Sequence, residues 1–563
     1  MAGSSHKPRL IIIGLDGVGL DMVEQFVAQG ELPNLKGILG SGCHASLVST
    51  LPAATYPAWT SFFTGANPGR HGVFDFTERQ GYRVRFINAS SRKLPTLFQV
   101  AEAQGLRCGV LGFPAMFPPE PLKGFCISGW DSPVASEADQ RHFHPPQLFD
   151  RMKQALGSQV LRFDDLDEFS ASDPAWPEQA LLGLPRKVRS RLEAGLWLLS
   201  NIEVDVFAIY FGEADTASHH LWSFHDPTSP FEGAGAGIGG KDPIQEVYRA
   251  LDEAVGRIRH AAPHATILVA SDHGSGGTGR RIVRLNRWLE EAGFLRFRQG
   301  LAVLAALTTP GWGARFATPR MRETLWNLGG KVLPSLVESA RRFGRIDFDR
   351  TAAMSEELHY APSILLNLQG REPRGTVSPR DRERVIREII DALDRLRDPE
   401  TGAPVILRAW PREEIYHGPF VHMAPDLVLE TSLDCRGQSP ACRPSMSQGP
   451  AITLLAAPVA RGSKGGLLPG SHRRFGLFGL SGPDIEFSGE IALSIEEAAS
   501  LALLAADVKP AWWMAVPHAA RAIFKDRNIA FMDQELRAAR SGFGSPRDPS
   551  VVADRLRKMG YVD

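Results

Sequence analysis

Residues 10–17 read LIIIGLDG, a continuous apolar run that leads into Asp16. An uninterrupted run of this kind predicts a parallel strand that is buried on both faces of its sheet. Two later apolar runs, Val204–Phe211 and Ala265–Ala270, also lead into segments that contain Asp and His. The carboxyl ends of parallel strands are where α/β proteins bind their ligands. This repeated arrangement is the main signal for both fold and function.

Apolar strands alternate with helical segments along most of the chain. The alternation predicts an α/β fold, with a doubly wound, mostly parallel sheet and helices on both faces. A stretch rich in Trp, Arg and Leu interrupts the pattern and is interpreted as an inserted helical cap. The expected division is a catalytic domain over 1–284 and 358–490, the cap over 285–357, and a C-terminal helical extension over 491–563.

Composition narrows the class of protein. The 563 residues are 43% hydrophobic and 22% charged, which is typical of a globular chain rather than a disordered one. Basic and acidic residues number 63 each, so no overall positive charge points to a nucleic-acid polymer as partner. We expect no membrane span, because the apolar runs are too short. The five cysteines are scattered, which favours a reducing compartment and a cytoplasmic location.

A threonine lies at the predicted start of a helix in the stretch from Pro52 to Phe76, PAATYPAWTSFFTGANPGRHGVFDF. Thr55 precedes Pro57 by two residues, and proline is common in the first turn of a helix. The N–H groups and dipole of a helix N-terminus favour an alkoxide and a phosphate. Thr55 is therefore a candidate nucleophile, provided that other residues activate it.

The segment EADTASHH provides the first pair of metal-ligand candidates. Asp215 and His219 are four residues apart, so on a helix they lie on one face and can bind one ion. The alternative is a capping Asp and a surface His. Their position directly after a buried strand favours the metal interpretation. His220 is expected to point elsewhere.

The segment SDHG provides a second pair, Asp272 and His273. Adjacent residues can reach one ion where the backbone is irregular, and we expect a glycine-rich turn after His273 to allow this. Alone, Asp16 would more often be a cap and His472 a surface residue. Together the set contains three Asp, three His and Thr55. Mixed nitrogen and oxygen donors suit zinc, with manganese or iron as alternatives, and the number of ligands indicates two divalent ions.

The order of these residues resembles the alkaline phosphatase superfamily, in particular its type I phosphodiesterase/nucleotide pyrophosphatase branch and the related phosphohydrolase/phosphomutase group. The matching stretches cover most of residues 9–485: IIIGLDGVG, LPNLKGILGSG, TYPAWTSFFTGANPGRHGVFDF, EADTASHH, SDHGSGG, LNLQGREPRG, APDLVLE and GSHRRFG followed by SGPD. The resemblance implies an alkaline phosphatase-like fold and a two-metal site with Thr55 as the nucleophile.

The resemblance also assigns the ligands. It implies one ion bound by Asp16, Thr55, Asp272 and His273, and a second bound by Asp215, His219 and His472. The better-known nucleotide pyrophosphatases have an asparagine at the position of Ala58. Without that phosphate donor, helix N–H groups or the arginines Arg280, Arg281 and Arg473 would bind the substrate.

Several other features have a structural interpretation. The glycines of residues 235–240 fit G-x-G-x-x-G but follow no strand, so we expect a loop rather than a dinucleotide site. His71 is expected to pack beneath the Thr55 helix. Arg371 and Arg374 are expected to fix a turn.

The sequence thus predicts a metal-dependent hydrolase of small phosphate esters, most readily a phosphodiesterase acting through a phospho-threonine. The alternatives are a phosphomonoesterase or phosphomutase on the same scaffold, and a metal-binding module without activity. Oligomeric state is left open.

Overall fold

The structure is a computed structural model that describes residues 7–128, 138–158, 166, 168–298, 339–340, 342–445, 449–462 and 467–524. Its centre is a nine-stranded sheet. In spatial order its strands are β19 (Gly489–Glu490), β2 (Cys43–Val48), β18 (Phe475–Ser481), β9 (Thr266–Ala270), β1 (Leu10–Leu15), β8 (Val206–Phe211), β5 (Cys108–Leu111), β6 (Phe125–Ile127) and β7 (Phe143–His144).

The three apolar runs form the middle of this sheet. β1 lies between β8 and β9 and pairs with both in parallel, so Gly14 lies beside both Tyr210 and Ala270. All residues of these three strands are buried, as their uninterrupted apolar sequences predict. β18 runs antiparallel between β9 and β2. The predicted α/β fold with a mostly parallel sheet is confirmed.

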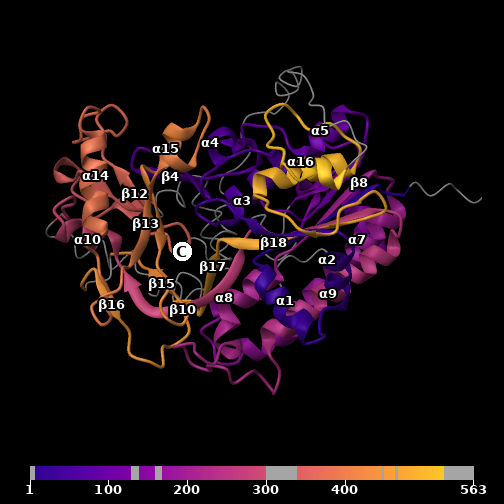
Figure 1. Ribbon diagram of the computed structural model, residues 1–563, viewed down its shortest axis with the longest axis horizontal. Coiled ribbons are helices and arrows are strands. Elements are labelled where there is room, and N and C mark those ends of the chain that lie inside the picture. The colour runs from indigo at the N-terminus through magenta and orange to yellow at the C-terminus, as the bar shows by residue number, and fades with distance from the viewer. Residues whose placement is uncertain are drawn as a thin grey trace, which may run out of the picture.

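Helices cover both faces of the sheet (Figure 1). One layer contains α1 (Leu20–Ala28), α2 (Pro33–Ser41), α7 (Trp176–Asn201), α8 (Glu213–His225) and α9 (Pro243–Ala261). The other contains α3 (Thr55–Thr64), α5 (Leu97–Ala103) and α16 (Ile495–Ala505). Burial of both sheet faces stabilises the arrangement through the large apolar area removed from water.

A second hydrophobic cluster forms a smaller lobe, seen at the left of Figure 1. Strand β10 (Gly274–Val283) leads the chain from the central sheet into this lobe. There it joins β15 (Ser439–Cys442), β16 (Ile452–Leu454) and β17 (Gly470–Arg473). A further sheet has the order β11 (Ala353–Met354), β12 (Ser363–Leu366), β14 (Leu427–Thr431) and β13 (Ile406–Pro411), with α10 (Leu285–Glu291) and α14 (Arg382–Leu393) beside it.

The expected glycine-rich turn after His273 is wrong. Residues from Gly274 onward belong to β10, which is ten residues long. Glycine is needed here for close packing: a Cβ on Gly274 would lie 2.3 Å from the Phe475 carbonyl oxygen, and one on Gly276 would lie 2.5 Å from Arg473 Nε. The sequence shows only that these positions are glycine, and glycine occurs in strands at close contacts as well as in turns.

The proposed domain limits stay predictions. Most of the expected cap, residues 299–338 and 341, lies outside the described residues. So do residues 525–563 of the expected C-terminal extension, whose described part includes α16 and α17 (Ala520–Ile523). Within the described parts of the chain, no helix is both long and apolar enough to cross a membrane.

Candidate active site

The carboxyl ends of three adjacent strands supply most of the candidate ligands. Asp16 follows β1, Asp272 and His273 follow β9, and α8, which follows β8, carries Asp215 and His219. The parallel order of the strands places these ends at one edge of the sheet. His472 arrives from β17, which pairs with β10 so that His472 lies opposite Ser275.

One group of potential ligands consists of Asp16, Asp272 and His273, all fully buried. His273 Nε2 lies 3.5 Å from Asp16 Oδ1 and 3.4 Å from Asp272 Oδ2. One ligand atom from each residue lies within 4.8 Å of the others, a spacing at which all three could bind the same ion.

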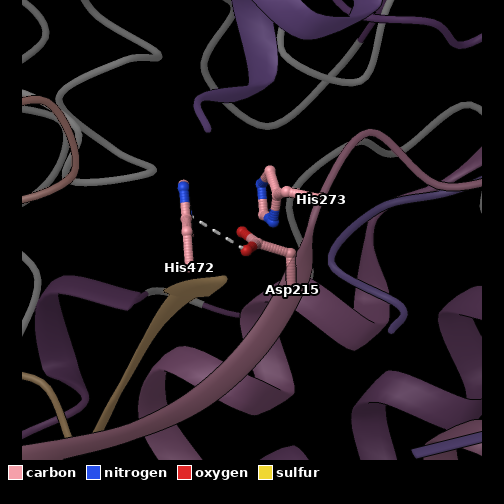
Figure 2. Close-up of side chains that lie close together, drawn as sticks. All are labelled: Asp215, His273 and His472. Carbon is pink, nitrogen blue, oxygen red and sulfur yellow. Dashed lines mark ion pairs between the residues drawn. The ribbon is translucent and has the colours of Figure 1, made fainter. Parts of the chain in front are cut away.

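A second group consists of Asp215, His273 and His472 (Figure 2). Asp215 Oδ1 lies 3.6 Å from His472 Nε2 and 3.3 Å from His219 Nε2. The two Nε2 atoms of His219 and His472 are 3.0 Å apart. The rings of His273 and His472 stack with their centroids 3.8 Å apart. Since His273 belongs to both groups, the two lie side by side.

The three histidines share a second feature that suits metal binding. Their Nδ1 atoms lie beside backbone carbonyls: Gly470 for His219 at 3.1 Å, Gly274 for His273 at 3.0 Å and Ala53 for His472 at 2.8 Å. Donation from Nδ1 to a carbonyl fixes the tautomer and leaves the Nε2 lone pair available as a ligand. Two such lone pairs at 3.0 Å, as in His219 and His472, repel one another unless a proton or a cation lies near both.

Thr55 occupies the first position of α3, after the extended residue Ala54. Residues on either side of Thr55 contact members of both ligand groups. The carbonyl of Ala53 accepts the hydrogen bond from His472, and the indole N–H of Trp59 donates to Asp16 Oδ2 at 3.2 Å. The nucleophile candidate therefore begins a helix whose flanks contact one ligand from each group.

Buried atoms without a hydrogen-bond partner test whether the candidate ligands fit a metal ion. Among the described residues, the candidate ligands include the following atoms that are buried without a hydrogen-bond partner: Asp16 Oδ1, Thr55 Oγ1, Asp272 Oδ2 and His273 Nε2. Buried polar atoms rarely lack a partner, and leaving one unsatisfied costs about 1–3 kcal/mol. Carboxylate, hydroxyl and imidazole atoms of this kind are ligands for a divalent cation, so the residues fit a metal site.

The electrostatics lead to the same interpretation. Burial, together with the charges of Asp272 and Asp215, raises the pKa of Asp16 well above its usual range. Burial and the charge of Asp215 also raise the pKa of Asp272. Burial opposes ionisation of Asp215 as well, but His219, His472 and His273 hold its pKa well below the usual value. A divalent cation would favour the ionised form of all three carboxyl groups.

Two aromatic residues beside Asp16 were missed in the sequence. The hydroxyl of Tyr210 donates to Asp16 Oδ2 at 2.5 Å, beside the Trp59 indole N–H. Both donors hold one oxygen of Asp16 and leave the other facing His273. The one available signal was a tyrosine near the end of the apolar run Val204–Phe211, where its hydroxyl would need a polar neighbour.

The remaining predicted residues have other contacts. His220 lies 3.3 Å from Glu168 and points away from the site, as predicted. Arg280 pairs with Glu400 at 3.0 Å, and Arg281 with buried Asp398 at 2.7 Å. Arg473 donates to the backbone carbonyls of His472, Gly277 and Gly437. The role of these three arginines in substrate binding stays a prediction.

The structural interpretations of two other motifs are confirmed. His71 is buried and lies 2.9 Å from Ser61 of α3, beneath the Thr55 helix. The glycines of residues 235–240 lie in the connection between α8 and α9 rather than after a strand.

Comparison with known proteins identifies a family. The family model described as "Type I phosphodiesterase / nucleotide pyrophosphatase" matches residues 10–436, most of the chain. His472 lies beyond the matched range, so its place in the ligand set depends on the geometry described above. Among the curated proteins, none matches the sequence.

A solved structure shares the fold. Phosphonoacetate hydrolase from Sinorhizobium meliloti 1021, in complex with phosphonoformate, superimposes with a TM-score of 0.52 at 16% identity, over 89% of this chain and 96% of that one. The same hydrolase with phosphonoacetate gives a TM-score of 0.48 at 15% identity, with the same coverage. At 16% identity, the likeness to the phosphonoformate complex concerns the fold alone.

Proposed function

The chain belongs to the type I phosphodiesterase/nucleotide pyrophosphatase family of the alkaline phosphatase superfamily, and we propose that it hydrolyses phosphodiesters through a covalent intermediate on Thr55. Membership makes it a phosphoric ester hydrolase. The observation that best supports the Thr55 route is the cluster of buried, unpaired ligand atoms that includes Thr55 Oγ1.

The chain's own residues suggest where metal would bind. Asp16, Thr55, Asp272 and His273 would hold one divalent ion, and Asp215, His219 and His472 the other. When bound, the ions supply positive charge that lowers the pKa of the Thr55 hydroxyl and offsets the charge of the phosphoryl group. The mixture of imidazole and oxygen ligands favours zinc.

In the first step Thr55 loses its hydroxyl proton, its Oγ1 attacks phosphorus, and a new P–O bond forms. The bond to the leaving oxygen breaks, and its electron pair departs with the alcohol, which then gains a proton. The N-terminal end of α3 faces the transferred group with its N–H donors, because Thr55 is the first residue of that helix. These donors would replace the side-chain amide that Ala58 lacks.

In the second step water loses a proton and attacks phosphorus, the bond between phosphorus and Oγ1 breaks, and Thr55 regains its proton. For a diester, the intermediate on Thr55 still carries the second ester group, so the product is a phosphate monoester. The net reaction consumes one water and yields one alcohol and one monoester. Burial of Thr55, Asp16 and Asp272 excludes bulk water from the nucleophile and strengthens the electrostatic interactions there.

The test compares native protein, Thr55→Ala and Thr64→Ala after loading with Zn²⁺ or Mn²⁺. Thr64 lies at the other end of α3, and its hydroxyl donates to Thr60 of the same helix, so it controls for damage to the helix. We expect Thr55→Ala to lower the rate on bis-p-nitrophenyl phosphate by about 10³-fold or more, whereas Thr64→Ala stays near native. Undiminished turnover by Thr55→Ala would exclude it as the nucleophile.

The same samples decide between the two kinds of ester. The diesterase proposal expects a higher kcat/KM for bis-p-nitrophenyl phosphate than for p-nitrophenyl phosphate. The reverse order would identify a phosphomonoesterase on the same scaffold.

A further inference from the structure

A short segment of the smaller lobe, residues 355–360, reaches the metal-ligand groups. The ring centroid of Tyr360 lies 6.2 Å from that of His472, and its hydroxyl donates to Asp75 at 3.1 Å. His359, next to it, lies close enough to His219 for the two imidazoles to interact electrostatically. This segment therefore borders the second group, which contains Asp215 and His472.

Buried Glu357 fixes the backbone of this segment. Its carboxylate accepts hydrogen bonds from the Asn286 N–H at 2.8 Å and the Ser445 N–H at 2.6 Å, and also from the Ser445 hydroxyl. Glu357 has a φ of 55°, in the left-handed region that residues with a side chain rarely adopt. Such a conformation persists where its surroundings hold it, as these three donors do.

His359 presents a hydrogen-bond donor of defined position. The Cys442 N–H donates to His359 Nδ1 at 3.2 Å, so in the neutral ring the proton lies on Nε2. The hydrogen bond from Cys442 therefore makes Nδ1 the acceptor and leaves Nε2 as the donor.

The Nε2 atom of His359 lacks a partner within the described residues. The side chain is partly exposed, but Nε2 itself is buried without a hydrogen bond. Buried N–H groups nearly always have an acceptor, and a structural histidine would be expected to satisfy both nitrogens. A donor fixed in this way, next to Tyr360, is available to an acceptor from a bound ligand.

We propose that His359 Nε2–H donates a hydrogen bond to the leaving-group oxygen of the ester, an inference that rests on the proposed function. Attack by Thr55 in line with the breaking bond places the leaving oxygen on the side of phosphorus away from Thr55. His359 lies within electrostatic range of His219, and its neighbour Tyr360 contacts His472. Both of these histidines belong to the ligand set that does not include Thr55. Negative charge develops on this oxygen as the bond to phosphorus breaks, and a preformed donor stabilises that charge.

The test uses diesters whose leaving groups differ in basicity: bis-p-nitrophenyl phosphate and diphenyl phosphate. The variants are His359→Ala, which removes the donor, and His359→Gln, which retains an N–H. His260→Ala, an exposed histidine of α9, is the matched control. All are measured with the same metal, and metal content is determined on each sample.

We expect His359→Ala to lower kcat/KM by about 10-fold on the nitrophenyl ester and about 10²-fold on the phenyl ester, where more charge develops on the leaving oxygen. His359→Gln should recover part of the loss on the phenyl ester, and metal content should equal that of native protein. Equal losses on both esters, no loss, or loss of metal would overturn the assignment.

The outcome can be separated from failure of the proposed function. If Thr55→Ala is inactive while His359→Ala loses activity equally on both esters or not at all, only the role of His359 is wrong. If Thr55→Ala remains active, the covalent route itself is wrong, whatever His359 does.

Discussion

His71 shows how a single buried residue supports the nucleophile helix. Its Nδ1 accepts a hydrogen bond from the Val73 N–H at 3.1 Å, so Nε2 carries the proton and donates to Ser61 at 2.9 Å. The bond accepted by Nδ1 needs the neutral ring, because a protonated ring has no acceptor. Burial, with the charge of Arg92, lowers the pKa of His71 to about 3 from a usual value of 6.5.

This shift predicts a pH dependence of stability. Between pH 6.5 and pH 3 the unfolded chain binds a proton at His71 that the native protein does not, so acid favours unfolding. We expect a loss of about 1.4 kcal/mol in the free energy of unfolding for each pH unit crossed in this window. His71→Gln keeps a donor and an acceptor but does not titrate.

Urea denaturation of native protein and His71→Gln at about pH 7 and about pH 5 checks this prediction. The free energy of unfolding should fall by about 2 kcal/mol more in the native protein than in the variant. Identical losses in both proteins would mean that His71 is not neutral in the folded state.

At the scale of elements, close packing of β17 on α8 brings His472 to His219. A Cβ on Gly470 would lie 2.0 Å from the Ser218 carbonyl oxygen, so only glycine fits at this contact. The Gly470 carbonyl also accepts the hydrogen bond from His219 Nδ1. One glycine thus sets both the distance between the two elements and the orientation of a proposed ligand.

Gly470→Ala should push β17 away from α8. We expect a loss of about 1–3 kcal/mol in the free energy of unfolding and weaker binding of Zn²⁺ by metal-free protein, measured by titration calorimetry. Gly40→Ala is the control, because Gly40 lies in α2 with no heavy atom within 4 Å of the added Cβ. Zn²⁺ affinity equal to that of native protein in Gly470→Ala would show that this contact does not position the ligands.

The same elements show what the sequence could predict. β1, β8 and β9 are buried on both faces, which leaves uninterrupted apolar runs that are readable without a structure. The glycines after His273 were misread as a turn. Glycine occupies these positions because Phe475 and Arg473, residues about 200 positions further along the chain, approach the backbone closely.

For the whole molecule, the site lies where the two lobes meet. The central sheet supplies Asp16, Asp215 and Asp272, whereas β17 and residues 355–360 approach from the strands that connect with the smaller lobe. His472 and His219 are 253 positions apart in the sequence, and no local pattern connects them. Spacing alone therefore marked His472 only weakly, and the family resemblance was needed to include it.

The same reason explains the residues that sequence reasoning missed. The importance of Tyr210 comes from its bond to Asp16, 194 positions away, and that of His359 comes from its bond to the Cys442 N–H, 83 positions away. Such roles depend on tertiary contacts that the periodicity of a sequence does not encode. In both cases a tertiary contact, rather than a motif, gives the residue its proposed role.

The most direct test of the Thr55 route is to trap the intermediate. Metal-loaded protein is mixed with excess bis-p-nitrophenyl phosphate, quenched in acid during turnover, digested and analysed by mass spectrometry. The prediction is one p-nitrophenyl phosphate group on Thr55, absent from Thr55→Ala. Active turnover without any adduct, or an adduct on a different residue, would contradict the assignment of Thr55 as the nucleophile.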